Sequence, residues 1–236
     1  MEAKSTIADI RQVAVVLRGE AEPINDWIQQ WNPGRIALYI AVILAGTGLY
    51  GAAMGCWRDA WQGFYTAIKF PLIVLLTTIG NGLLNGMLAP LLGLNITFRQ
   101  SIQAVLMSFM IAGAILGSFS PIAFYLVWNV PLMSPHARGA YDFILLTHVI
   151  VIAFAGIAAN VRLRELLQRL SGSQVVGRRV LFAWMAGNLF LGSQLSWILR
   201  PFIGSPSMAV EFLRSDAFSG NFYEAVFGTI RQMLFS

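Results

Sequence analysis

Long stretches of this chain contain no charged side chain, and the longest of them covers positions 100 to 137, between Arg99 and Arg138. A helix needs about 20 predominantly apolar residues to cross roughly 30 Å of hydrocarbon. Only 11% of the 236 residues are charged and 57% are hydrophobic, whereas soluble domains carry about 25% charged residues. The pattern predicts an all-α, polytopic transmembrane helical bundle. It excludes a soluble enzyme, a disordered tail and a disulfide scaffold, which a single cysteine, Cys56, cannot build.

Charged residues at the ends of the apolar intervals predict five spans. The interval after Arg99 is interpreted as one long helix kinked at Pro121, because the piece that follows this proline is too short to cross a bilayer. The predicted spans cover residues 36–56, 70–92, 102–128, 140–160 and 180–199. This divides the chain into a cytoplasmic N-terminal part (1–34), a five-span domain (35–200) and an outer C-terminal segment (201–236).

The distribution of Lys and Arg predicts the orientation, because cytoplasmic loops carry an excess of positive charge. With the N-terminus inside, most of the 16 basic residues lie on the inner side, and the cluster from Arg162 to Arg179 dominates. We therefore expect a bacterial inner-membrane protein with its C-terminus outside. The net charge of +5 fits anionic lipid headgroups. The expected partners are the bilayer and other membrane subunits or a second copy, and nucleic acid is rejected because no basic run with interleaved aromatics occurs.

Both ends of the chain are predicted to form interfacial amphipathic helices. Near the N-terminus, Thr6 with Asp9 opens a helix whose apolar residues recur at helical spacing; these are Ile7, Ile10, Ala14 and Leu17. The segment after position 208 is rich in aromatic residues but has too many charges to cross. A further short helix on the outer face is expected between the first two spans, where Trp57, Trp61, Tyr65 and Ile68 repeat every three or four residues.

Glycine pairs spaced four residues apart occur in three of the predicted spans. These are Gly51 with Gly55, Gly82 with Gly86, and Gly113 with Gly117. Such pairs let helix backbones approach closely, so the first three spans are expected to form a tight core. Gly46 to Gly51 also reads G-x-G-x-x-G, but a dinucleotide fingerprint requires a βαβ unit, which a transmembrane span cannot provide.

Polar side chains within the spans are candidate functional residues, since they are costly in hydrocarbon. Thr77, Asn81 and Asn85 share one face of the second span, and His148 lies in the fourth; Asn188 and Gln194 lie in the fifth. One hypothesis is a polar conduit or small-molecule site, and the alternative is interhelical hydrogen bonding. For His148 the alternatives are a packing role, an axial ligand to haem or chlorin, and a proton relay. No cofactor or metal is predicted.

The stretch at residues 91–106, Leu-Leu-Gly-Leu-Asn-Ile-Thr-Phe-Arg-Gln-Ser-Ile-Gln-Ala-Val-Leu, opens the third span with a capping box at Thr97 and Gln100. With the glycine-rich second span before it and the proline in the third span after it, this stretch resembles the Yip domain family over residues 36–160. The resemblance implies five spans and a cytoplasmic N-terminus. Eukaryotic members are linked to Rab GTPases and vesicle traffic. The acidic Asp-Leu-Tyr-Gly-Pro element of those members is absent here, so the resemblance does not extend to a GTPase partner.

Catalytic templates are missing from the sequence. It contains no H-E-x-x-H, P-loop or G-x-S-x-G motif, and no catalytic residue is nominated. The sequence therefore predicts a non-enzymatic membrane scaffold or accessory subunit of a larger complex. A transporter or channel component that uses the polar residues of the spans is the first alternative, and a cofactor-binding subunit that depends on His148 is the second.

Overall fold

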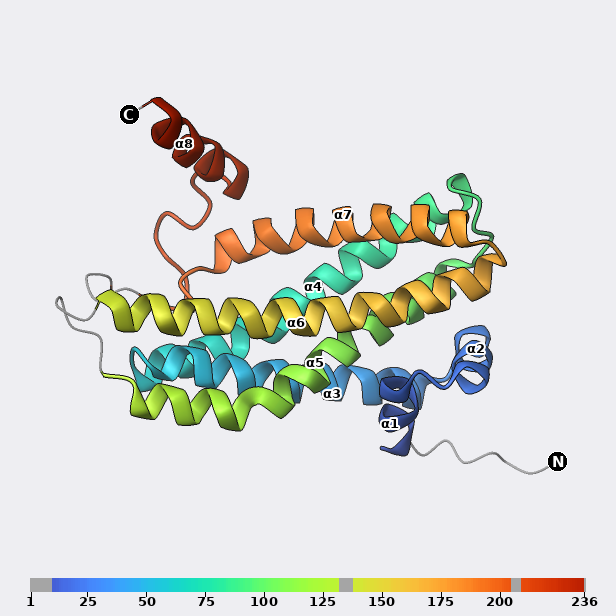
Figure 1. Cartoon of the computed structure of the whole chain (residues 1–236), viewed down its shortest axis with the longest axis horizontal. Helices are drawn as coiled ribbons and strands as arrows, with labels where there is room; N and C mark the ends of the chain where they lie inside the picture. The colour runs from blue at the N-terminus through green and yellow to red at the C-terminus, as the bar shows by residue number, and fades with distance from the viewer. Residues whose placement is uncertain (1–9, 132–137, 205–208, 236) are drawn as a thin grey trace.

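The computed structural model describes residues 10–131, 138–204 and 209–235, and helices dominate these residues. Five long helices form the body, two short helices precede them and one follows (Figure 1). The helices are α1 (Arg11–Arg18), α2 (Ala21–Gln29), α3 (Pro33–Cys56), α4 (Ala60–Leu91), α5 (Phe98–Asn129), α6 (Arg138–Ser171), α7 (Gln174–Leu199) and α8 (Phe222–Phe235). No strand occurs in the described part of the chain, which confirms the all-α prediction.

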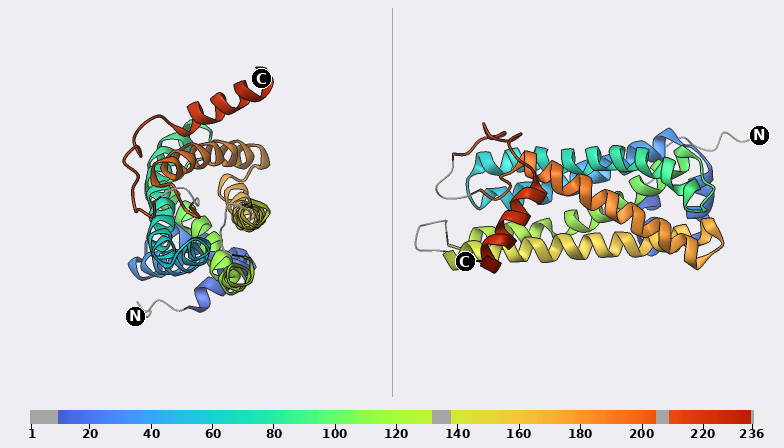
Figure 2. Two further views of the ribbon diagram at one scale, coloured as in Figure 1. Left: turned by 90° about the vertical axis from the view of Figure 1, so that its left-hand side faces the viewer. Right: turned by 90° about the horizontal axis from the view of Figure 1, so that it is seen from above.

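The five long helices run alternately up and down the bundle. Helix α3 packs against α4 and α5, α4 also packs against α5 and α7, and α6 packs chiefly against α5 and α7 (Figures 1 and 2). The end where α6 turns into α7 carries Arg164, Arg169, Arg178 and Arg179, and we call it the basic end. The opposite end, where α3 turns into α4 and α7 stops, contains a cavity that is described below, and we call it the cavity end.

Four helices, α3 to α6, are long and apolar enough to cross a membrane. These four helices fit a multi-pass membrane protein. The fifth predicted span forms α7, which is long enough but does not belong to this group, because polar residues such as Asn188 and Gln194 lower its mean hydropathy. The count of five spans therefore stays a prediction.

Two helices, α4 and α6, extend ten or more residues beyond the spans that the sequence predicted. The expected separate helix at residues 57–68 is instead the beginning of α4, which runs unbroken through Pro71 to Leu91. Asp59 caps this helix, as its carboxylate accepts from the Trp61 N–H at 2.8 Å. Helix α6 continues past residue 160 to Ser171, where Gly172 takes a positive φ of 61° and ends it.

The N-terminal helices pack on the bundle through a face that the sequence did not predict. Val13 and Val16 of α1 are buried, whereas Ile10 and Leu17 of the expected apolar face are exposed. The reason is that α1 packs beside α5, where it joins a hydrophobic cluster that includes Met107. Ile7 and the expected helix start at Thr6 lie outside the described residues, and the interfacial position of α1 stays a prediction.

Glycines lie where the helix backbones come closest. A Cβ at Gly51 would meet the Thr66 carbonyl oxygen of α4 at 2.6 Å, and one at Gly55 would meet Gln62. A Cβ at Gly117 of α5 would meet the Gly46 Cα of α3 at 2.9 Å, and Gly113 of α5 faces Ile43 of α3. Gly82 and Gly86 of α4 face Ile102 and Phe98 of α5. Close backbone contact therefore joins α3 to α4, α3 to α5, and α4 to α5.

Candidate functional site

The six polar residues singled out from the sequence do not form one site. Thr77, Asn81 and Asn85 lie buried on one face of α4. The other three lie in different places: Asn188 bonds to Asn81, His148 lines a cavity, and Gln194 accepts from the Phe222 N–H of α8 at 3.2 Å. The predicted conduit is thus separated into an α4–α7 contact, a cavity and a contact with α8.

The α4–α7 contact is an interhelical amide bond. Asn81 Nδ2 donates to Asn188 Oδ1 at 2.6 Å and to the Trp184 carbonyl at 3.4 Å. Thr77 faces Gly192 of α7, and its hydroxyl has no partner among the described residues. The same holds for both amide atoms of Asn85. The Asn81–Asn188 bond thus joins α4 to α7 in the way that polar residues commonly join helices inside membranes.

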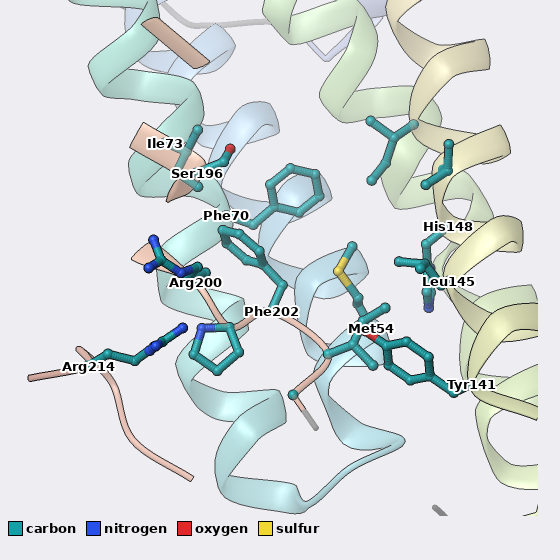
Figure 3. Close-up of a pocket in the computed structure, with 15 residues that line it drawn as sticks. Met54, Phe70, Ile73, Tyr141, Leu145, His148, Ser196, Arg200, Phe202 and Arg214 are labelled. Carbon is teal, nitrogen blue, oxygen red and sulfur yellow. The ribbon is translucent and has the colours of Figure 1, made fainter. Parts of the chain in front are cut away.

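A cavity of about 510 Å³ that could hold a ligand lies at the cavity end of the bundle. Most of its lining is apolar. Helix α3 contributes Met54, α4 contributes Phe70 and Ile73, and α6 contributes Tyr141, Leu145, His148, Val149 and Ile152. Ser196 of α7, residues 200–204 and Arg214 complete it. Figure 3 shows the two arginines at one side of this space and His148 at the other, with Phe70, Phe202 and Met54 between them.

Arg200 and Arg214 bring two guanidinium groups to the cavity. Arg200 stacks over the Trp197 ring at 3.4 Å and donates to the Trp197 carbonyl at 2.6 Å. Asp216 bonds Arg214 at 2.7 Å and lies 3.8 Å from Arg200. Burial and the neighbouring Arg214 lower the pKa of Arg200 from its ordinary value, and Asp216 opposes this shift. One carboxylate therefore faces two cations, which leaves local positive charge.

His148 lies deep in the opposite wall and is 4% exposed. Its Nδ1 is 2.9 Å from the hydroxyl of Tyr50, a fully buried residue of α3, and the two rings meet edge to face. Its Nε2 has no hydrogen-bond partner among the described residues. Asp142 lies on the same helix, but no bond between it and His148 is present. Because Nε2 is buried as well, His148 contributes its ring to the cavity lining rather than an accessible hydrogen-bonding atom.

The segment at residues 200–204 closes one side of the cavity, and three side chains of α4 hold it there. Gln62 Nε2 donates to the carbonyls of Pro201 and Phe202, both at 2.9 Å. Thr66 donates to the Phe202 carbonyl at 2.7 Å. Lys69 is fully buried, and its Nζ donates to the Pro201 carbonyl at 3.1 Å and to the Glu211 carbonyl at 3.5 Å.

Sequence reasoning missed this arrangement because it treated Lys69 and Arg200 as charges that flank spans. A signal was nevertheless present. Gln62, Thr66 and Lys69 follow one another at intervals of four and three residues, which places three donors on one helix face. A stripe of this kind on an apolar helix indicates a polar partner, and here the partner is backbone that would otherwise lack bonds.

The polar groups that line the cavity are few. No group of three or more His, Cys, Asp or Glu residues that could hold a metal ion occurs in the described part of the chain. The cavity combines an apolar lining and two cations with His148, Tyr141 and Ser196, and no hydrogen bond joins these three residues to one another.

No protein-family model, curated protein or solved structure matches this chain. The similarity to Yip domain proteins therefore stays a prediction from residues 91–106.

Proposed function

We propose that this chain is a non-catalytic membrane subunit that holds an amphiphilic molecule in the cavity between α3, α4, α6 and residues 200–204. The observation that carries the proposal is the combination of an apolar lining of about 510 Å³ with two guanidinium groups at one side. Ligand cavities commonly measure roughly 300–1,000 Å³ and combine an apolar wall with a few polar groups.

The position of the cavity supports an amphiphile over a water-soluble ligand. The apolar lining residues of α3, α4 and α6 belong to helices that are long and apolar enough to cross a membrane. Arg200 and Arg214, in contrast, follow the end of α7. Lipids place their headgroups beyond the hydrocarbon and their chains within it. In the same way, the two arginines of the cavity lie beyond the end of α7, and its apolar wall lies along the helices.

A role as an accessory subunit, with partner proteins in a larger complex, belongs to this proposal, since the site offers binding without reactive groups. The proposal also includes five spans, Yip-like membership, a bacterial inner-membrane location, a cytoplasmic N-terminus and an outer C-terminus. Helix α8 supports an interfacial C-terminal segment, because it lies across the direction of the bundle at the cavity end (Figure 2). Its exposed Tyr223 and Phe227 are suited to the membrane surface.

Native mass spectrometry of the protein purified in mild detergent tests the proposal. We expect a bound amphiphile in the wild type and its loss in a Leu145→Trp/Val149→Trp variant, whose indoles fill the cavity. The matched control is Leu146→Trp/Ile150→Trp, because both residues are exposed on the same helix and neither lines the cavity. The proposal fails if the wild type carries no amphiphile, or if both variants retain it equally.

A further inference from the structure

We infer that the ligand of this cavity is an anionic glycerophospholipid, whose phosphate binds between Arg200 and Arg214 and whose acyl chains follow the apolar lining. This inference rests on the proposed function and names the class of its ligand. It depends on three features of the cavity: the charge at one side, the prior orientation of the guanidinium groups, and the apolar lining.

The charge around residues 200–216 favours an anion. Arg200 and Arg214 share the single carboxylate of Asp216, and their side chains are only 20% and 23% exposed. Lys69 lies in the same region, since it binds the carbonyl of Pro201, the residue next to Arg200; the side chain of Glu211 is the acid near it. The cations outnumber the acids, so an anionic headgroup gains attraction where a neutral one does not.

The guanidinium of Arg200 is held in place before any ligand arrives. Trp197 lies under its plane, and the Trp197 carbonyl accepts from its Nη1. An arginine presents five N–H donors in a rigid fork that matches phosphate and carboxylate oxygens. Within the described part of the chain, Arg200 donates through Nη1 and Arg214 through Nη2, which leaves further N–H groups that could bind a ligand. Fixed donors lower the cost of ordering the site when the ligand binds.

The lining beyond the arginines favours a ligand with long apolar chains. His148 belongs to this lining, but its Nε2 is buried and offers no donor to the ligand. The cavity is partly open, which allows acyl chains to extend into the bilayer.

The test measures binding of three amphiphiles to the full chain, delipidated in detergent: phosphatidylglycerol, phosphatidylcholine and oleate. We expect phosphatidylglycerol to bind about tenfold more tightly than phosphatidylcholine, because both carry a phosphate but the two guanidinium groups repel the choline cation of the latter. It should also bind more tightly than oleate. Arg200→Gln/Arg214→Gln should reduce the preference for the anionic lipid to near unity. Arg178→Gln/Arg179→Gln, two exposed arginines at the basic end, should leave it unchanged.

The variant Arg200→Lys/Arg214→Lys guards against misfolding of the glutamine variant, because it keeps both charges and should retain part of the preference.

Each other outcome is decisive. Equal binding of the two phospholipids overturns the inference but leaves the proposed function standing, and so does a preference that survives in the glutamine variant. Tighter binding of oleate overturns the assignment to a phospholipid. If no amphiphile binds, both the inference and the proposed function fail.

Discussion

The contact between α3 and α5 and the wall of the cavity are built from opposite kinds of residue. In the first, Gly46, Gly113 and Gly117 bring two backbones together with almost no side chain between them. In the second, the long polar side chains of Gln62, Thr66 and Lys69 reach across to the carbonyls of residues 201–211.

The comparison shows how one bundle can combine a closely packed helix contact with a cavity. Contacts between glycines depend on van der Waals attraction over many atoms, and any added atom disrupts them. The cavity wall depends on a few hydrogen bonds, which hold a segment in place without filling the space beside it. We therefore expect substitutions in the two regions to differ in size and in what they change.

The largest effect is expected from Gly46→Leu. A Cβ at this position would collide with the backbone of Gly113, which cannot move as a flexible side chain can. Overpacking of this kind costs roughly 3 kcal/mol or more of unfolding free energy. Thermal unfolding followed by circular dichroism in detergent, with gel filtration of the product, measures it. Gly156→Leu is the control, because a Cβ at Gly156 of α6 meets nothing within 4 Å. Equal melting temperatures for the two variants would contradict the close contact of α3 with α5.

Lys69→Met should have a smaller and more local effect. It removes the donor to the Pro201 and Glu211 carbonyls and should cost about 1–3 kcal/mol, the typical penalty for an unsatisfied buried polar group. We expect faster cleavage by proteinase K within residues 200–221, mapped by mass spectrometry, while the rest of the bundle stays resistant. The neighbouring exposed Ile68→Met provides the control. An unchanged cleavage pattern would show that Lys69 does not hold the segment.

The smallest effect is expected at the Asn81–Asn188 bond, which joins α4 to α7. A double-mutant cycle with Asn81→Leu and Asn188→Leu should give a coupling energy of about 0.6 kcal/mol, with an upper bound near 1.7 kcal/mol. Unfolding free energies in mixed detergent supply the four values. The control cycle pairs Asn81 with Asn160, whose amide bonds Gly156 within its own helix, and should give no coupling. A coupling well above the bound would indicate a shared polar site rather than a single bond.

Composition and charge spacing were enough to predict the helical class and the core of each long helix. The helix ends were harder, because local signals compete with tertiary contacts. Asp59 caps α4 eleven residues before the predicted span begins, and the first turns of this helix bury Gln62, Gly63 and Thr66 while Trp61, Phe64 and Ile68 stay exposed. The N-terminal face was wrong for a similar reason, since Ile10 and Val13 are equally apolar and only the neighbouring helix α5 decides which is buried.

The candidate site could be predicted only in part. His148 was a candidate from the start, because a titratable side chain is rare in a span. Its partners Tyr50 and the cavity come from helices far apart in the sequence, and no local spacing brings them together. Arg200 and Arg214 were interpreted as topology signals, since a positive charge after a span has the same sequence pattern whether it meets water or a ligand. The backbone carbonyls that accept from Lys69 cannot be identified from the sequence.

The route of the chain around the cavity also determines the order in which it can be completed during synthesis. Helices α3, α4 and α6 supply three walls, and they are synthesised before residues 200–214. The close contacts of α3 with α4 and α5 join helices that precede α6 and can form early. The fourth wall and both guanidinium groups arrive last. A lipid that occupies this space therefore has the surrounding bilayer as its source, and it can be enclosed only when most of the chain has already been translated.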